Sequence, residues 1–372
     1  MRRLPYSLTA KDATRAWRRM AVAWLGLSAM ATLLAGCSLI DDDLDDCGTV
    51  YALDYELQLV TNINLELQAE QQTGLNPDVA AALRQHLSTI FTDFAHDVDL
   101  SFYDTQGDSA RLHHDEHVMD ANQASYSLFL PKRQYMHLAV ANVADNSLVT
   151  LVDDERCHSS WLRQQPDTIG SHTTGLFTAR QPMDVLEGVD QQFHVKLYMA
   201  NCAAALVIDP RGHSLDGAQV YTTGFATGFR VADSAYVFPA TSPMVRTTRI
   251  DAGGQVSFCS VSFPSRESGS TRWGKPTGTD GGTTTRSVIE TEDPFVSDGS
   301  AKALWQFRAY VPKGDGTITE TVLSLHRPLR AGQFEVVRAF VTEDGVVMTE
   351  DQTVGVSVTL DWKKGNNYEV PL

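Results

Sequence analysis

Apolar and polar residues alternate along many short segments of this chain, which is the pattern of strands with one buried face. In the last of these segments, Val354, Val356, Val358, Leu360 and Trp362 occupy every second position. Burying each such side chain is worth about 1.5 to 3 kcal/mol, so we expect this strand to be central to its sheet's core. The sequence predicts strands within 50–67, 98–103, 125–130, 136–143, 195–208, 303–311, 317–325 and 354–362.

One segment has a helical pattern instead. Val79, Leu83, Leu87 and Phe91 follow one another at four-residue steps, directly after Asn76-Pro77. Asn can cap a helix, and Pro at the first helical position loses no hydrogen bond that the helix needs. We therefore predict a single helix, which lies on the core of a sheet in the N-terminal half.

Short turn motifs separate the expected strands at 105–108, 314–316 and 343–345, and a break falls near residue 188. The chain shows no alternation of strands and helices of the kind that builds parallel sheets. The sequence therefore predicts an all-β protein, mainly antiparallel, with one helix in the N-terminal domain. Two β-sandwich domains are expected at 48–188 and 189–372, and the Gly/Thr-rich segment 274–286 is expected to be a surface loop.

The N-terminus has the three parts of a secretory signal: basic residues, an apolar stretch from Met20 to Leu34, and small residues before Cys37. The run Leu33 to Cys37 resembles the signals of bacterial lipoproteins. We expect residues 1–36 to be removed and Cys37 to carry acyl chains such as palmitate, each buried methylene adding about 0.8 kcal/mol of membrane affinity. An uncleaved membrane helix is the alternative, because about 17 apolar residues can span a bilayer, but such a helix has no need of Ala-Gly-Cys at its end.

Residues 37–47 are expected to form an acidic tether, since five Asp lie between Asp41 and Asp46. Acidic residues after an acylated cysteine also resemble the surface-export signals of Bacteroidota lipoproteins. The full chain has 30 basic and 46 acidic residues; without residues 1–36, 24 and 45 remain, a formal net charge of −21. This charge argues against nucleic acid as a partner, since phosphate binding depends on Lys and Arg. The lipid must therefore supply the membrane affinity.

Four cysteines remain if Cys37 is acylated, an even number that favours disulfides in an exported protein. Four cysteines allow three pairings, of which domain locality favours Cys47 with Cys157 and Cys202 with Cys259. The alternative for Cys202, which begins a run of seven apolar residues, is a buried free thiol.

The sequence offers little catalytic chemistry. His113, Asp115 and His117 could converge on a metal if the segment were a strand, but we expect a solvated loop there and no metal. The nucleophile-elbow, phosphate-loop and dinucleotide motifs do not occur. We therefore expect no enzymatic activity and no cofactor. Among the tryptophans, Trp305 and Trp362 are expected in the core, whereas Trp161 and above all Trp273 are candidates for exposed contacts.

Several segments, taken in order, resemble the fimbrial anchor lipoproteins of the type V pilus system in Bacteroidota, the FimB-like family. The helix that ends in Ile90 to Phe94 is one of them. The others are CSLIDDDLDDC (37–47), DVDLSFYDTQGD (97–108), SLFLPKRQYMHLAVANV (127–143), FHVKLYMANCAAALVI (193–208) and VTLDWKKGNNYEVPL (358–372). The segment 193–208 resembles the first strand of the family's second domain.

This resemblance implies two transthyretin-like sandwich domains in tandem and a role without catalysis. The protein would anchor the base of a fimbria to the outer membrane at the cell surface and influence its length, by strand-mediated binding of the first stalk subunit. Only Cys37 carries over as a functional position. Because the chain stops soon after its last expected strand, we expect a terminal subunit. The alternatives are a surface glycan-binding lipoprotein, which would need exposed aromatic residues, and an accessory or tip adhesin.

Overall fold

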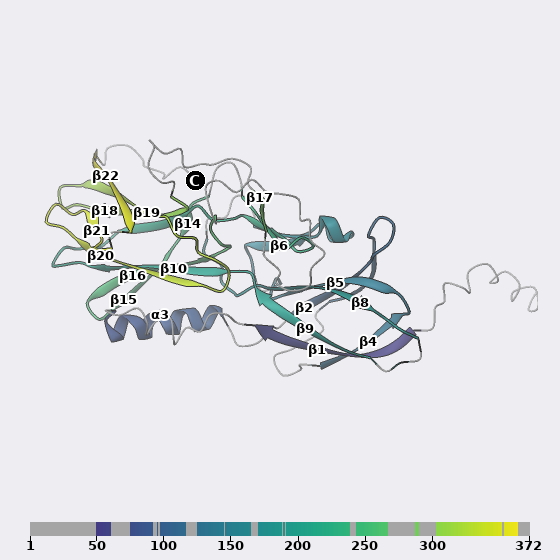
Figure 1. Cartoon of the computed structure of the whole chain (residues 1–372). Helices are drawn as coiled ribbons and strands as arrows, with labels where there is room; N and C mark the ends of the chain where they lie inside the picture. The colour runs from purple at the N-terminus through teal and green to yellow at the C-terminus, as the bar shows by residue number, and fades with distance from the viewer. Residues whose placement is uncertain are drawn as a thin grey trace, which may run out of the picture. The chain divides into compact units, whose positions relative to one another are not determined.

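The computed structural model describes residues 50–60, 75–91, 95, 97–116, 125–144, 146–164, 170–187, 189, 191–238, 243–266, 287–289, 303–351 and 353–363. The chain forms two compact units, Met1–Tyr51 and Ala52–Leu372. The described part is built of strands, most of them antiparallel, with one α-helix (Figure 1), which confirms the predicted all-β class. No helix in this part is both long and apolar enough to cross a membrane. Cys37 and the acidic tether lie outside the described residues.

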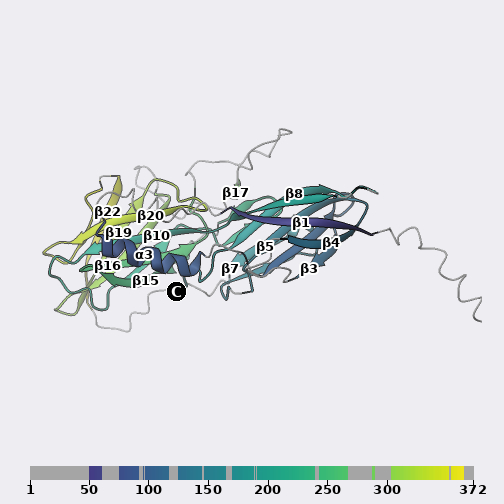
Figure 2. The ribbon, with the colours of Figure 1, turned by 90° about the horizontal axis from the view of Figure 1, so that it is seen from below.

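The first sheet has seven strands in the order β3-β2-β5-β8-β9-β1-β4. β8 and β9 pair only where Phe177 meets Met199 and Thr178 meets Tyr198, so the sheet divides there into two layers. The layer of β9, β1 and β4 runs below β5 and β8 in Figure 1, and Figure 2 shows β1 and β4 in front of β5 from below. The seven strands are β1 (Val50–Val60), β2 (Val98–Asp104), β3 (Arg111–Asp115), β4 (Ser125–Pro131), β5 (Gln134–Ala141), β8 (Phe177–Asp184) and β9 (Gln192–Met199).

The strand expected at 195–208 is in fact two strands in two different sheets. β9 pairs in parallel with β1, from Asp54 opposite Gln192 to Val60 opposite Tyr198. The next strand, β10 (Cys202–Asp209), belongs to another sheet. β9 alternates between exposed and buried residues, whereas β10 is buried along nearly its whole length. Apolar residues continue across the change, so the sequence pattern does not reveal it. The limits 48–188 and 189–372 stay a prediction, although the β8–β9 pairing spans residue 188.

A second sheet combines strands from distant parts of the sequence. Its order is β17-β13-β12-β7-β6, and Phe229 of β12 lies opposite Leu162 of β7. A buried cluster joins this sheet to the first one, with Leu138 and Val140 from β5 against Phe229 and Tyr236. The segment 228–237 therefore completes a core that the N-terminal half begins. The five strands are β6 (Val149–Val152), β7 (Trp161–Gln164), β12 (Gly228–Arg230), β13 (Ala235–Val237) and β17 (Ser287–Ile289); a short 3₁₀ helix, Cys157–Ser159, precedes β7.

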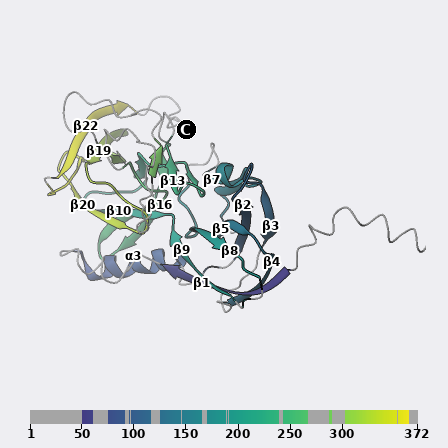
Figure 3. The same ribbon diagram turned by 45° about the vertical axis from the view of Figure 1, so that its right-hand side comes forward.

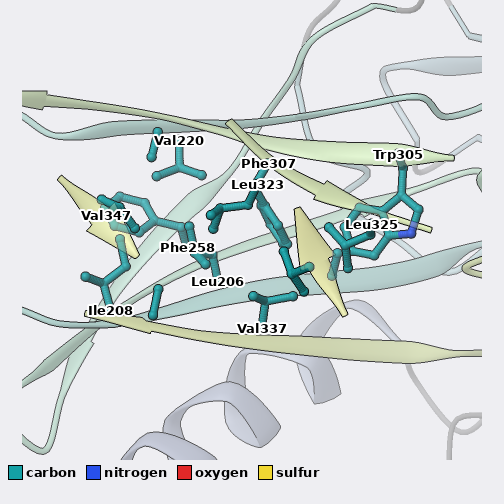
Figure 4. Packing of buried hydrophobic residues seen from close by; sticks show 14 of the residues in the cluster. Leu206, Ile208, Val220, Phe258, Trp305, Phe307, Leu323, Leu325, Val337 and Val347 are labelled. Atoms are coloured by element: carbon teal, nitrogen blue, oxygen red, sulfur yellow. The ribbon is translucent and has the colours of Figure 1, made fainter. Parts of the chain in front are cut away.

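The remaining two sheets face each other across an apolar cluster. One has the order β15-β16-β10-β20-β21 and the other β14-β11-β18-β19-β22. Figure 4 shows Leu206 and Phe258 from the first sheet against Phe307 and Leu323 from the second, with Trp305 at one end. The other strands are β11 (Gln219–Thr223), β14 (Val245–Arg246), β15 (Thr248–Ala252), β16 (Gln255–Ser262), β18 (Trp305–Pro312), β19 (Thr317–Leu325), β20 (Phe334–Val341), β21 (Val347–Met348) and β22 (Val354–Lys363).

The predicted helix is confirmed as α3 (Pro77–Ile90), but it covers a different sheet from the one expected. The amide of Asp78 donates to the side chain of Asn76, so Asn76 is the cap and Pro77 the first residue. α3 contacts β15 and β16, and Figures 1 and 3 show it against their sheet. The helix of the N-terminal half therefore covers the outer face of a sheet that the C-terminal half builds.

β22 forms where the alternation of 354–362 predicted a strand, but it lies at an edge. It pairs only with β19 in the described part of the chain. Val354 belongs to the cluster between the sheets and Val356 packs against it, in keeping with the expected place of this strand in the core. Alternation reports one buried face and not the number of neighbouring strands. The predicted turns at 105–108, 314–316 and 343–345 are confirmed between β2 and β3, β18 and β19, and β20 and β21, with Gly107, Gly316 and Gly345 at positive φ.

Candidate functional site

The three cysteines that the structure describes, Cys157, Cys202 and Cys259, are buried free thiols. The expected bridge between Cys202 and Cys259 does not form. Cys259 lies opposite Ala205 on β10, three residues from Cys202. An odd offset places the two side chains on opposite faces of the sheet, and only Cys202 faces the cluster between the sheets. The partner expected for Cys157, Cys47, lies outside the described residues, so that pairing stays a prediction.

Burial makes these thiols poor nucleophiles. Desolvation raises the pKa of the Cys259 thiol to about 12 and that of Cys202 further still, while the pKa of Cys157 is also raised by burial. Thiolates are the reactive form of cysteine. None of the three is therefore suited to redox or nucleophilic chemistry.

The histidine-rich segment forms the edge strand β3 and not the solvated loop that we expected. His113 Nε2 lies 3.0 Å from an Asp115 carboxylate oxygen, and His114 contacts Ser101 Oγ at 2.9 Å and Glu116 at 3.0 Å. The described residues include no group of three or more potential metal ligands. His117 lies outside them.

Two tryptophans can be placed. Trp305 is fully buried and its indole N–H donates to the carbonyl of Arg327 at 3.0 Å, which confirms the core prediction. Trp161 is half-buried, with its N–H 3.3 Å from an Asp153 carboxylate and the Arg163 guanidinium 5.5 Å from its ring. Trp273 and the side chain of Trp362 lie outside the described residues.

The strongest candidate for a binding site is the edge of β20. β21 pairs with β20 only at Phe340 and Val341, so Glu335–Ala339 have no neighbouring strand on that side among the described residues. A recess of about 700 Å³ lies beside this edge and extends across the sheet as far as Asp209 of β10 and Gln255 of β16. We call it the β20 recess; it is lined by Asp209, Arg211, Gln255, Arg327, Glu335, Val336, Arg338, Ala339, Phe340, Thr349, Glu350 and Asp351.

Residues 349–351 follow β21 and line the β20 recess. Exposed ion pairs fix their position. Arg211 lies 3.6 Å from Glu350, and Arg327 lies 3.6 Å from Asp351 while also bonding Glu335. Glu350 is 82% exposed. Exposed pairs of this kind contribute about 0 to 1 kcal/mol each, so this segment is weakly held.

The electrostatics of the β20 recess are mixed. Burial raises the pKa of Glu335 against the opposing effect of Arg327, whereas hydrogen bonds from Thr353, and then the arginines, lower the pKa of Asp351. The Arg211 guanidinium lies 3.6 Å from the centre of the Phe340 ring. Arg338 is exposed and forms no ion pair or hydrogen bond with a described residue.

A smaller cavity of about 250 Å³ adjoins the same edge through Arg327. It is lined by Leu325 and Val354, which belong to the cluster between the sheets, together with His326 and Thr353. The open side of this sandwich therefore offers a polar recess on the outer side of β20 and an apolar cavity toward the core.

The first sheet also has two edges, and both are less suited to receiving a strand. β3 is five residues long, carries Arg111, His113, His114 and Asp115, and shifts register against β2. Short, charged and irregular edges discourage further pairing. β4 exposes Phe129 but ends at Pro131, which has no N–H to donate.

The sequence analysis did not identify the residues of the β20 recess. The segment 334–341 was not among the expected strands, although its single Glu and single Arg within an apolar run were a usable signal. No sequence pattern could show that residues 349–351 and Arg211 lie at the same edge.

No protein-family model matches this chain, and no curated protein matches it in sequence. Its fold is similar to solved structures that include the fimbrial anchor protein Mfa2 from Porphyromonas gingivalis, at 10% identity over 83% of this chain and 97% of that one, with a TM-score of 0.39. A fimbrial assembly protein from Parabacteroides distasonis matches at 10% identity over 83% and 99%, with a TM-score of 0.34. A candidate adhesin from Bacteroides thetaiotaomicron matches at 10% identity over 82% and 96%, with a TM-score of 0.47.

These neighbours include a fimbrial anchor protein, the class that the sequence resembles. Identities of 9 to 13% and TM-scores below 0.5 assign no function to this chain. The functional argument therefore rests on its own residues.

Proposed function

We propose that this protein is a non-enzymatic lipoprotein that anchors the base of a fimbria to the outer membrane, at the cell surface, and receives the first stalk subunit at the edge of β20. The observation that carries this proposal is the incomplete pairing of β20, whose residues Glu335–Ala339 adjoin a recess instead of a strand. Backbone groups at such an edge can pair with an extended segment of another protein.

Attachment to the membrane is proposed from the sequence. The run from Leu33 to Cys37 and the acidic residues after it are those of a lipoprotein with a spacer. A chain with a formal net charge of −21 after removal of residues 1–36 needs the acyl chains for its membrane affinity. The anchor then has two ends, the lipid at Cys37 and the partner at β20.

The first test is deletion of the gene, followed by electron microscopy and fractionation of the cell surface. We expect fimbriae shed into the medium or altered in length, and restoration by the wild-type chain but not by Cys37→Ala. Fimbriae unchanged in number, length and attachment after deletion would refute the anchor function.

The second test locates the contact. A photo-reactive phenylalanine analogue is placed at position 338, in the β20 recess, or at position 246, an exposed arginine on β14. We expect a cross-link to a fimbrial subunit from position 338 and none from position 246, identified by mass spectrometry. A cross-link to a subunit from position 246 alone would show that the contact does not lie at β20. A glycan array probed with residues 48–372 tests the competing function, which micromolar glycan binding would favour.

A further inference from the structure

The two rows of side chains along β20 differ in chemistry, and a strand added at this edge would meet both. Val337 and Ala339 point into the cluster between the sheets. Val336, Arg338 and Phe340 alternate with them on the outer side and line the β20 recess. In a strand, successive side chains point to opposite faces, so a partner strand must present one row to the core and one row to the recess.

The inner row requires apolar side chains from the partner. Val337 and Ala339 are buried, and the adjoining cavity is lined by Leu325 and Val354. A polar side chain placed there would lose its water without gaining a hydrogen bond. The partner segment is therefore apolar at every second position.

The outer row contains one cation, Arg338, that has an electrostatic attraction to Asp351 but no direct ion pair or hydrogen bond among the described residues. Arg211 is engaged by Glu350 and by the Phe340 ring, and Arg327 by Glu335 and Asp351. Arg338 forms no such pair with a described residue and lines the β20 recess. Residues directly opposite each other on neighbouring strands interact, and opposite charges are favourable there.

We propose that the β20 recess selects a partner segment that carries a carboxylate opposite Arg338, within a strand that is apolar at alternate positions. This inference rests on the proposed function and specifies the chemistry of its partner. Arginine holds a carboxylate through paired N–H donors. Asp351 also attracts Arg338, but its direct ion pair is with Arg327, and that of Glu350 is with Arg211, so the Arg338 guanidinium keeps its N–H donors for a partner carboxylate.

The test uses synthetic peptides of about nine residues, with Val at every second position, Thr at the others, and Glu, Gln or Lys at the centre of the Thr row. Their affinity for the mature unlipidated chain is measured by titration calorimetry. We expect the Glu peptide to bind about fivefold more tightly than the Gln peptide, as a favourable cross-strand charge pair predicts, and the Lys peptide to bind most weakly. Added salt should reduce these differences.

Arg338→Gln should abolish the preference for Glu over Gln, whereas Arg246→Gln, at an exposed arginine on β14, should leave it intact. Equal binding of the three peptides by the wild-type chain would overturn the carboxylate selection while leaving the strand-addition site in place. Binding of none of them would overturn both the selection and the site. Gene deletion tests membrane anchoring independently of either result.

Discussion

Asn76 joins the start of α3 to the turn between β15 and β16. Its side-chain oxygen Oδ1 accepts from the Asp78 backbone amide at 2.9 Å, and its side-chain NH₂ group donates to the Gly253 carbonyl at 3.0 Å. Gly253 has a φ of +57°, and a Cβ at this position would lie 2.7 Å from the Asn76 amide nitrogen. One side chain therefore caps the helix and positions the turn against it.

Gly253→Ala is expected to destabilise the chain more than Gly254→Ala. Both glycines have positive φ, which costs an alanine about 1 to 2 kcal/mol, but a Cβ at Gly254 would have no atom within 4 Å. The clash with Asn76 should add about 1 kcal/mol, the typical value of an N-cap. Urea denaturation measures both variants, and equal losses would show that the contact contributes nothing.

Two buried histidines should make stability fall as the medium becomes acidic. Burial lowers the pKa of His137, stacked 4.4 Å from Phe102, and of His172 to about 4. In the unfolded state the two histidines become protonated below about pH 6.5, whereas in the folded state they stay neutral down to about pH 4. As the pH falls from 6.5 to 4, each histidine therefore lowers the free energy of unfolding by on the order of 3 kcal/mol.

Unfolding free energies at pH 7.5 and 4.5 measure this effect. His137→Gln should lose less stability between the two pH values than the wild-type chain does. His213→Gln, in the turn after β10, serves as the control and should behave as the wild type. An unchanged acid loss in His137→Gln would exclude this histidine as a cause.

At the scale of elements, the sequence predicted several of the strands, such as β2, β5 and β19, and where α3 begins, because periodicity and capping are local properties. It did not predict what each element packs against. Neither the alternation of β22, which lies at an edge, nor the continuous apolar run of β10, which lies between two strands, identifies the neighbouring strands. The apolar face of α3 at Val79, Leu83 and Leu87 fits any apolar sheet face, so its position on β15 and β16 follows from tertiary structure alone. The β20 recess was missed for the same reason.

α3 is expected to protect Cys259 from alkylation. Cys259 faces away from the cluster between the sheets, on the side of β16 that α3 contacts. Leu83→Ala removes a buried side chain of α3 and should cost about 2 to 5 kcal/mol. Iodoacetamide labelling, followed by mass spectrometry, should then accelerate at Cys259 more than at Cys202. Equal acceleration at both cysteines would show that α3 does not open separately.

At the scale of the whole molecule, the two sequence halves share their cores. The segment 228–237 supplies β12 and β13 beside β7, and α3 supplies the cover of β15 and β16. The cluster that contains Leu138 and Phe229 would be open on one side if either half were alone. Alternation and turn motifs carry no information about such exchange, and the limits 48–188 and 189–372 stay a prediction.

Residues 48–188 and 189–372 produced separately should therefore lack stable tertiary structure. We expect each fragment to bind the dye ANS and to unfold without a cooperative transition, and co-expression to restore a soluble complex. A cooperative transition in both isolated fragments would show that each half folds independently.

The short passage from β9 to β10 through Ala200 and Asn201 has a mechanical consequence for an anchor. In the proposed anchor, the membrane would pull on the start of β1, which is parallel to β9, and the fimbria would pull on β20, which is parallel to β10. Tension applied at the first end of one parallel strand and the last end of its neighbour acts as shear, so the hydrogen bonds between them share the load instead of opening one by one. Asn201 links the two sheared strand pairs, so the same tension would pass through both. Its side chain accepts a hydrogen bond from the Leu176 amide, and its backbone carbonyl accepts one from the Gly332 amide.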